Sequence, residues 1–168
     1  DDEGEHVGAF EAATGKTTWS YLLDDRVFPD AKGGDGPRAT PTIVGEALFT
    51  IGAHGVMVSL DRADGSLRWR KDVVKDFAGG TPKFGYSESL LVSHGKVFVV
   101  GGGAGQALIA LSAADGSVRW KTGDYGASYS SPIAVSLHGE PNVVALTRTH
   151  LVGVHCGSGR DSGCRCRR

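Results

Sequence analysis

The chain alternates apolar and polar residues in short runs, and each run ends at a turn-forming pair. Between residues 40 and 73 the runs are "TPTIV" (40–44), "ALFTIGA" (47–53), "VMVSLD" (56–61) and "SLRWRKDV" (66–73). Alternation of this kind gives a strand one apolar and one polar face, and short links rich in Gly, Asp and His suit antiparallel hairpins. The pattern predicts four antiparallel strands here, and no segment of the chain has a sustained helical period.

The same phrase of sequence recurs along the chain. Its copies are "GAFEAATGKTTW" (8–19), "VSLDRADGSLRW" (58–69) and "IALSAADGSVRW" (109–120). The turn glycines Gly15, Gly65 and Gly116 are 50 and 51 residues apart, and a degraded fourth copy, "VGVHCGSGR", contains Gly159. Periods of about 40 to 50 residues are typical of propellers and similar arrays.

Each clear copy closes on a tryptophan: Trp19, Trp69 and Trp120. A single four-stranded sheet cannot bury both of its faces, but sheets stacked radially cover one another. We therefore expect the glycine to turn the chain and the tryptophan, with about 150–250 Å² of surface, to fill the gap between neighbouring sheets.

These residues resemble a known family. "LDRADGSLRW" and "LSAADGSVRW" are similar to the A-x-D/T-G-x-x-x-W signature of PQQ-like (pyrroloquinoline-quinone-type) β-propeller repeats, and the resemblance covers roughly residues 8 to 160. It implies blades of four antiparallel strands, often seven or eight to a closed ring. Members include quinoprotein alcohol dehydrogenases and the non-catalytic lipoprotein of the outer-membrane β-barrel assembly machinery, and the resemblance implies a periplasmic or extracellular protein.

The blades expected from the repeat do not complete a ring. We expect an all-β propeller segment of about three and a half blades, followed at residues 161–168 by a disordered or aberrant tail, because "RDSGCRCRR" (160–168) has no apolar alternation. The expected units are a partial blade at 1–23, full blades at 38–75 and 86–123, and a partial blade at 128–160. Remaining blades, or self-association of the open ends, would then cover the terminal sheets.

Composition and charge narrow the classes of partner. Of the 168 residues, 40% are hydrophobic, 22% are charged and 26 are glycine, which favours tight turns over long helices. The net charge of −1 and the lack of a basic stripe argue against nucleic acid. No run of 18 apolar residues occurs, so we expect no membrane span.

The sequence offers little redox chemistry. The resemblance implies that dehydrogenases of the family hold their quinone with a stacked tryptophan, a disulfide between adjacent cysteines, and Ca²⁺ bound by Glu, Asn and Asp. No two cysteines are adjacent here, and all three tryptophans occupy the repeat position. The spacing of Cys156, Cys164 and Cys166 matches no common zinc arrangement. We therefore expect no catalytic, cofactor-binding or metal-binding residue in this segment, with PQQ and Ca²⁺ relevant only if it belongs to a dehydrogenase.

One set of residues suggests a binding surface. The first strand of each blade is entered by "GPRATP" (36–41), "FGYSES" (84–89) and "ASYSSP" (127–132), and aligning these places Arg38 with Tyr86 and Tyr129, and Thr40 with Glu88 and Ser131. First strands are innermost in a propeller, so we expect Arg38, Tyr86, Glu88 and Tyr129 at one mouth of the central channel. Charged groups there would need ion-pair partners, channel water or a ligand.

Together these features favour a non-catalytic binding or scaffolding module whose protein partner or small ligand the sequence does not identify. The alternative is a fragment of a PQQ-dependent alcohol or sugar dehydrogenase.

Overall fold

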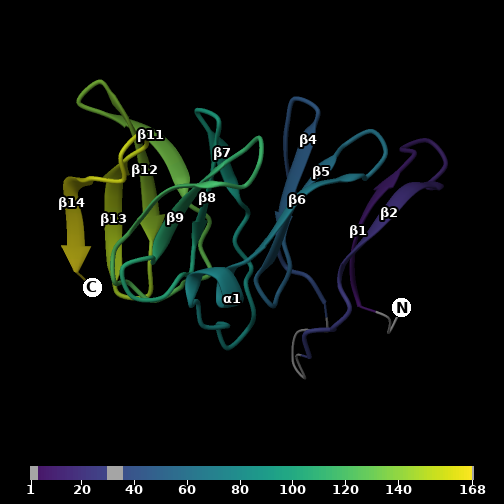
Figure 1. Cartoon of the computed structure of the whole chain (residues 1–168), viewed down its shortest axis with the longest axis horizontal. Coiled ribbons are helices and arrows are strands. Elements are labelled where there is room, and N and C mark those ends of the chain that lie inside the picture. The colour runs from purple at the N-terminus through teal and green to yellow at the C-terminus, as the bar shows by residue number, and fades with distance from the viewer. Residues whose placement is uncertain (1–3, 30–35, 168) are drawn as a thin grey trace.

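The computed structural model describes residues 4–29 and 36–167, and strands in this part of the chain form four antiparallel sheets (Figure 1). Blade 1 pairs β1 (Glu5–Phe10) with β2 (Thr17–Asp24). Blade 2 contains β3 (Thr42–Val44), β4 (Ala47–Ile51), β5 (Val56–Asp61) and β6 (Leu67–Asp72). Blade 3 contains β7 (Leu91–Ser93), β8 (Lys96–Val100), β9 (Leu108–Ser112) and β10 (Val118–Thr122). Blade 4 contains β11 (Ile133–Leu137), β12 (Glu140–Leu146), β13 (His150–His155) and β14 (Asp161–Arg167).

Each four-stranded blade is a meander in which neighbours in sequence are neighbours in the sheet. The blades follow one another side by side from the N-terminal to the C-terminal end without closing a ring (Figure 1). This confirms the predicted all-β propeller architecture of four-stranded antiparallel blades.

Three apolar clusters hold the blades together, one in each seam between neighbours. Blades 1 and 2 share a cluster that includes Val7 and Leu60, blades 2 and 3 one that includes Phe49 and Ile109, and blades 3 and 4 one that includes Phe98. Strands β4, β5, β8 and β9 are buried over almost their whole length because their alternate side chains enter two different seams.

The repeat tryptophans occupy the seams in the same way each time. The Trp19 Nε1 atom donates to the Arg62 carbonyl at 3.0 Å, the Trp69 Nε1 atom to the Ala113 carbonyl at 3.0 Å, and the Trp120 Nε1 atom to the Cys156 carbonyl at 3.1 Å. Each indole also covers the turn glycine of the following blade, namely Gly65, Gly116 and Gly159. The tryptophan of one copy therefore docks on the glycine turn of the next.

The structure contradicts the prediction of a disordered or aberrant tail at 161–168. Residues Asp161–Arg167 form β14, which pairs with β13 and completes blade 4; Arg168 lies outside the described residues. An outermost strand is held by main-chain hydrogen bonds to one neighbour, so it does not need the apolar alternation on which the prediction relied. In the fourth copy Gly163 takes the position of the tryptophan, four residues after the turn glycine.

A single short helix, α1 (Val73–Phe77), follows β6 within the described part of the chain. Its N-cap is Asp72, whose Oδ1 atom accepts from the amides of Val74 and Lys75 at 3.0 Å, as is usual for an N-cap aspartate. Val73 and Phe77 are buried in the seam between blades 2 and 3. Among the described residues, no helix is long and apolar enough to cross a membrane.

Candidate functional site

The segments that lead into the first strand of each blade lie next to one another. The Thr40 amide donates to Ser89 Oγ at 3.3 Å, and the Ser89 amide donates to Ser131 Oγ at 2.8 Å. Ser89, and not Glu88, is thus the residue that lies level with Thr40 and Ser131. Counting back two residues along each segment, Ser87 lies level with Arg38 and Tyr129.

The predicted alignment is therefore wrong by one residue in the middle segment. Because successive side chains of an extended chain point to opposite sides, this shift turns Tyr86 and Glu88 away from the channel. Both side chains are only 1% exposed, so the prediction that they ring the channel mouth is wrong. The correct register keeps the offset of 49 residues between blades 2 and 3, which also places Gly85 level with Gly36; both glycines have positive φ values, of 73° and 111°.

Tyr86 fills the seam between blades 2 and 3. Its hydroxyl lies 3.1 Å from the carbonyl oxygens of both Gly80 and Gly101 and can donate to either. Its ring lies so close to Gly55 and Gly101 that a methyl group on either would come within 2.9 Å and 2.5 Å of a ring carbon. Tyr86 therefore closes this seam at the end of the molecule that carries the β8–β9 turn.

Glu88 is buried one step further along the same segment. Its carboxylate accepts from the Val100 amide, at 2.9 Å to Oε1 and 3.2 Å to Oε2. Burial raises the pKa of Glu88 well above its ordinary value, and the hydrogen bond from Val100 only partly opposes this. Glu88 thus braces the entry segment against β8 from inside the blade.

Arg38 and Tyr129, the other two residues predicted at the channel mouth, have different neighbours. Arg38 is half-buried, with its guanidinium carbon 5.5 Å from the centre of the Phe28 ring and its Nη1 atom donating to the Gly36 carbonyl at 3.1 Å. Tyr129 is 46% exposed, and its ring centre is 5.8 Å from that of Phe84. Their role in binding remains a prediction, and only Tyr129 lines the pocket described next.

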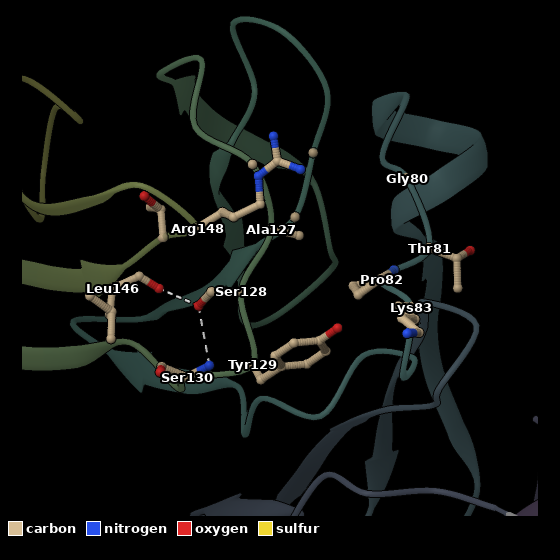
Figure 2. Close-up of a pocket in the computed structure, with 14 residues that line it drawn as sticks. Gly80, Thr81, Pro82, Lys83, Ala127, Ser128, Tyr129, Ser130, Leu146 and Arg148 are labelled. Atoms are coloured by element: carbon tan, nitrogen blue, oxygen red, sulfur yellow. Dashed lines mark hydrogen bonds between the residues drawn. The ribbon is translucent and has the colours of Figure 1, made fainter. Parts of the chain in front are cut away.

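A pocket of about 680 Å³ opens in the seam between blades 3 and 4. In the corrected register Ser128 occupies the place of Tyr86, and its hydroxyl likewise donates to a main-chain carbonyl, that of Leu146. A serine cannot fill the space that the tyrosine ring fills in the preceding seam, so the seam stays open. Four segments line the pocket (Figure 2): residues 80–83, 101–102, 126–130 and 146–148. Sequence reasoning missed it because Tyr86 and Tyr129 were aligned with each other.

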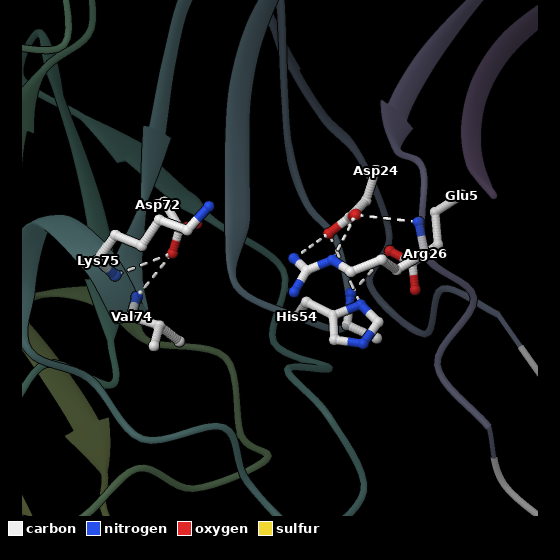
Figure 3. Close-up of polar contacts among 8 residues, drawn as sticks. Glu5, Asp24, Arg26, His54, Asp72, Val74 and Lys75 are labelled. Carbon is white, nitrogen blue, oxygen red and sulfur yellow. Dashed lines mark hydrogen bonds and ion pairs between the residues drawn. The ribbon is translucent and has the colours of Figure 1, made fainter.

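A second polar cluster lies in the seam between blades 1 and 2 (Figure 3). Arg26 binds both carboxylate oxygens of Asp24, at 2.9 Å from Nε and 2.7 Å from Nη2, and His54 Nδ1 lies 3.6 Å from Asp24 Oδ2. Glu5 Oε2 accepts from the Ala53 amide at 2.9 Å. Glu5 and Asp24 belong to blade 1 whereas Ala53 and His54 belong to blade 2, so the cluster joins the two blades.

The pKa values in this cluster reflect burial and charge. Burial raises the pKa of Glu5. Burial also acts to raise the pKa of Asp24, but the hydrogen bonds and charge of Arg26 outweigh it and hold that pKa below its ordinary value. Burial and the Arg26 charge lower the pKa of His54, despite the opposing effect of Asp24. The Arg26–Asp24 ion pair thus lies at the end of blade 1, and the contacts of Asp24 with His54 and of Glu5 with Ala53 connect blade 1 to blade 2.

His155 and Cys156, at the end of β13, contribute to a turn and to packing between blades. Cys156 is buried in the seam between blades 3 and 4. His155 Nδ1 accepts from the Gly157 amide at 3.1 Å within the β13–β14 turn. Among the described residues, no group of three or more His, Cys, Asp or Glu side chains could hold a metal ion.

Comparison with known proteins links the chain to two kinds of relative. It is 33% identical over 132 residues to quinohemoprotein alcohol dehydrogenase ADH-IIG of Pseudomonas putida, which covers 75% of this chain and 16% of that protein. It is 28% identical over 119 residues to outer membrane protein assembly factor BamB of Burkholderia pseudomallei, which covers 70% of this chain and 28% of that protein.

Solved structures show the same fold. The crystal structure of BamB from Moraxella catarrhalis matches with a TM-score of 0.67 at 18% identity, over 99% of this chain and 44% of that one. The ADH-IIG structure from Pseudomonas putida matches with a TM-score of 0.56 at 23% identity, over 76% of this chain and 20% of that one. The chain thus spans less than half of each of these relatives.

A family model matches nearly the whole chain. The model described as "Outer membrane protein assembly factor BamB" matches residues 3–163, which is nearly the whole sequence. With the repeated tryptophan–glycine seams and the four-stranded blades, this match shows that the chain belongs to the PQQ-like β-propeller repeat family.

Proposed function

We propose that the chain is a non-catalytic binding or scaffolding module, working in the periplasm or outside the cell. The observation that carries the proposal is the pocket left open where Ser128 replaces a seam-filling tyrosine. At the end of the molecule that carries the pocket, packed or ion-paired side chains fill the two seams on either side of blade 2. The seam between blades 3 and 4 instead presents exposed polar and aromatic groups there. Kinship with an outer membrane protein assembly factor supports a role in binding other proteins.

The alternative function is that of a quinoprotein dehydrogenase segment, which the 33% identity to a quinohemoprotein alcohol dehydrogenase favours. The described residues do not form a binding site for the quinone and Ca²⁺ that such an enzyme needs. Each tryptophan indole is packed in a seam with its Nε1 atom bonded to a main-chain carbonyl, so none is available to stack on a quinone. Within the described ranges, the acidic, histidine and cysteine side chains form no cluster suited to Ca²⁺.

Crosslinking tests the binding function. A photo-crosslinking residue replaces Ala104, in the exposed turn between β8 and β9 at the pocket end, or Ala114, in the exposed turn between β9 and β10 at the opposite end. In the cells that make the protein, we expect Ala104 to give a discrete protein adduct and Ala114 to give none. Equal labelling from both positions, or none from either, would contradict the proposal.

A quinone titration tests the alternative. When the protein is added to PQQ, we expect no calcium-dependent change in the absorbance of PQQ. The reason is that the described residues include no cluster of acidic side chains that could bind Ca²⁺. The control repeats the titration with a chelator in place of Ca²⁺. A saturable change that requires Ca²⁺ would favour the dehydrogenase function.

A further inference from the structure

The pocket between blades 3 and 4 is lined by cations and no anions. Lys83 and Arg148 are the charged residues of its lining, and no Asp or Glu contributes to it. The ion pairs that the described residues form engage other cations, such as Arg26, Arg62 and Arg68. Since the protein as a whole carries a charge of −1, a positive pocket is a local feature and not a consequence of overall composition.

The polar frame of the pocket is already hydrogen-bonded to itself. Ser128 donates to the Leu146 carbonyl and accepts from the Ser130 amide at 3.2 Å. The Arg148 amide donates to the Gly126 carbonyl at 3.0 Å, and Thr147 Oγ1 donates to the His150 carbonyl at 2.9 Å. These bonds fix the loop, so the guanidinium of Arg148 and the ammonium of Lys83 remain as its strong donors toward a ligand.

Two exposed rings stand beside these cations. Phe84 and Tyr129 are each 46% exposed, and their ring centres lie 5.8 Å apart at an interplanar angle of 48°. Lys83 Nζ lies 5.3 Å from the centre of the Phe84 ring, close enough for a cation–π interaction. Figure 2 shows the Tyr129 ring pointing across the pocket toward Pro82 and Lys83. The site therefore combines positive charge with an apolar aromatic surface.

We propose that this pocket binds a carboxylate-bearing ligand that also carries an apolar group. Arg148 or Lys83 pairs with the carboxylate, because each supplies a cationic donor to a lining that contains no Asp or Glu. Tyr129, which lines the pocket, contacts the apolar part, and Phe84 extends the aromatic surface beside it. A volume of about 680 Å³ is within the range of ligand pockets and larger than a single carboxylate needs. The proposal rests on the binding function above and names the chemistry of what is bound.

A carboxylate of this kind comes either from an acidic side chain of a partner protein or from a free organic acid. The test titrates the protein, by calorimetry, with a short Glu-Phe peptide blocked at both termini and with phthalate. A peptide in which Gln replaces Glu is the matched control. Binding of the Glu peptide alone assigns the site to a protein segment, and binding of phthalate alone assigns it to a small acid. Equal binding of the Gln peptide, or no binding of either acid at millimolar concentration, overturns the proposal.

Variants localise the binding. Arg148→Gln and Lys83→Gln should each weaken the acid by about tenfold, whereas Arg70→Gln, at an exposed arginine of β6, should leave it unchanged. Ser128→Tyr restores the side chain that fills the preceding seam and should abolish binding while the melting temperature stays at or above that of the parent. Retained affinity in a folded Ser128→Tyr protein would show that the acid binds elsewhere.

The binding function and the carboxylate ligand can be tested independently of each other. The crosslinking residue at Ala104 lies outside the pocket lining and reports any protein at that end of the molecule, whatever its chemistry. Crosslinking without carboxylate binding would retain the binding function and exclude this ligand class.

Discussion

At the scale of single residues, the turn glycines differ in what surrounds them although their backbone is the same. Gly15 and Gly116 have φ values of 71° and 69°. A methyl group on Gly116 would lie 3.0 Å from Trp69, whereas none of the described protein lies within 4 Å of one on Gly15. The two positions therefore separate the backbone requirement for glycine from the requirement imposed by tryptophan docking.

We expect Gly15→Ala to lower the free energy of unfolding by about 1 kcal/mol, the cost of a left-handed conformation for alanine. Gly116→Ala should cost about 1–3 kcal/mol more, because the new methyl group presses on Trp69 in a packed seam. Urea denaturation of both variants measures the difference. Equal losses would mean that the indole moves aside freely and that the seam is loosely packed.

Glu88 is a residue whose burial should make stability depend on pH. Its pKa is raised in the folded protein, so the folded state holds a proton that the unfolded state has lost. The stabilisation is complete below the unfolded pKa of about 4.5 and is lost as the pH rises toward the folded value, at up to about 1.4 kcal/mol per pH unit.

Glu88→Gln removes this titration. The free energy of unfolding of the variant minus that of the parent should therefore increase from pH 4 to pH 8. Denaturant unfolding at both pH values measures this difference. A constant difference between Glu88→Gln and the parent across this range would contradict the assignment.

At the scale of elements, the side chain of Asp72 caps the short helix α1. Five residues are too few for a stable isolated helix, so its cap and its buried residues must hold it in place. Asp72→Ala should lower the free energy of unfolding by about 1 kcal/mol, because it removes the acceptor for two helix amides. Asp72→Asn keeps a side-chain oxygen at the cap and should cost less. Thermal unfolding compares the two, and similar losses would show that the cap is not what stabilises α1.

At the scale of the whole molecule, the two terminal sheets present apolar residues to solvent. Phe10 and Leu22 of blade 1 are 64% and 46% exposed, and Ile133 and Leu151 of blade 4 are 55% and 40% exposed. The opposite faces of these sheets are buried against blades 2 and 3. Exposed apolar sheet faces and unpaired strand edges promote association.

We therefore expect the purified 168-residue chain to self-associate at tens of micromolar, as measured by light scattering. Leu22→Ser combined with Ile133→Ser should reduce the association. Leu67→Ser changes a residue exposed to a similar extent on β6, inside the row of blades, and should not. A stable monomer of the parent chain would show that the terminal sheets are covered in another way.

The sequence by itself determined the repeating unit. Alternation with a period of two residues specifies strands, Asp-Gly or Thr-Gly specifies the turn, and a tryptophan four residues after the glycine specifies the seam. The amino-acid sequence alone was therefore enough to assign Trp19, Trp69 and Trp120 to the gaps between blades. These signals are local, because the residues involved lie close together in the chain. The family follows from the same signals.

Only the tertiary structure decided the candidate site. Tyr86 and Glu88 lie level with Pro37 and Ala39, and not with Arg38 and Thr40, as the contacts of Thr40, Ser89 and Ser131 show. The repeated tyrosines Tyr86 and Tyr129 favoured the wrong register in the sequence, although Gly36 and Gly85 align in the right one. The pocket exists because Ser128 meets residues 80–83 of another blade across a seam, and the Glu5–Ala53 contact joins residues 48 apart. Strand β14 forms because an unpaired edge of β13 is available to it, although its own sequence has no strand pattern. Contacts of this kind depend on how blades stack, which the pattern within one blade does not encode.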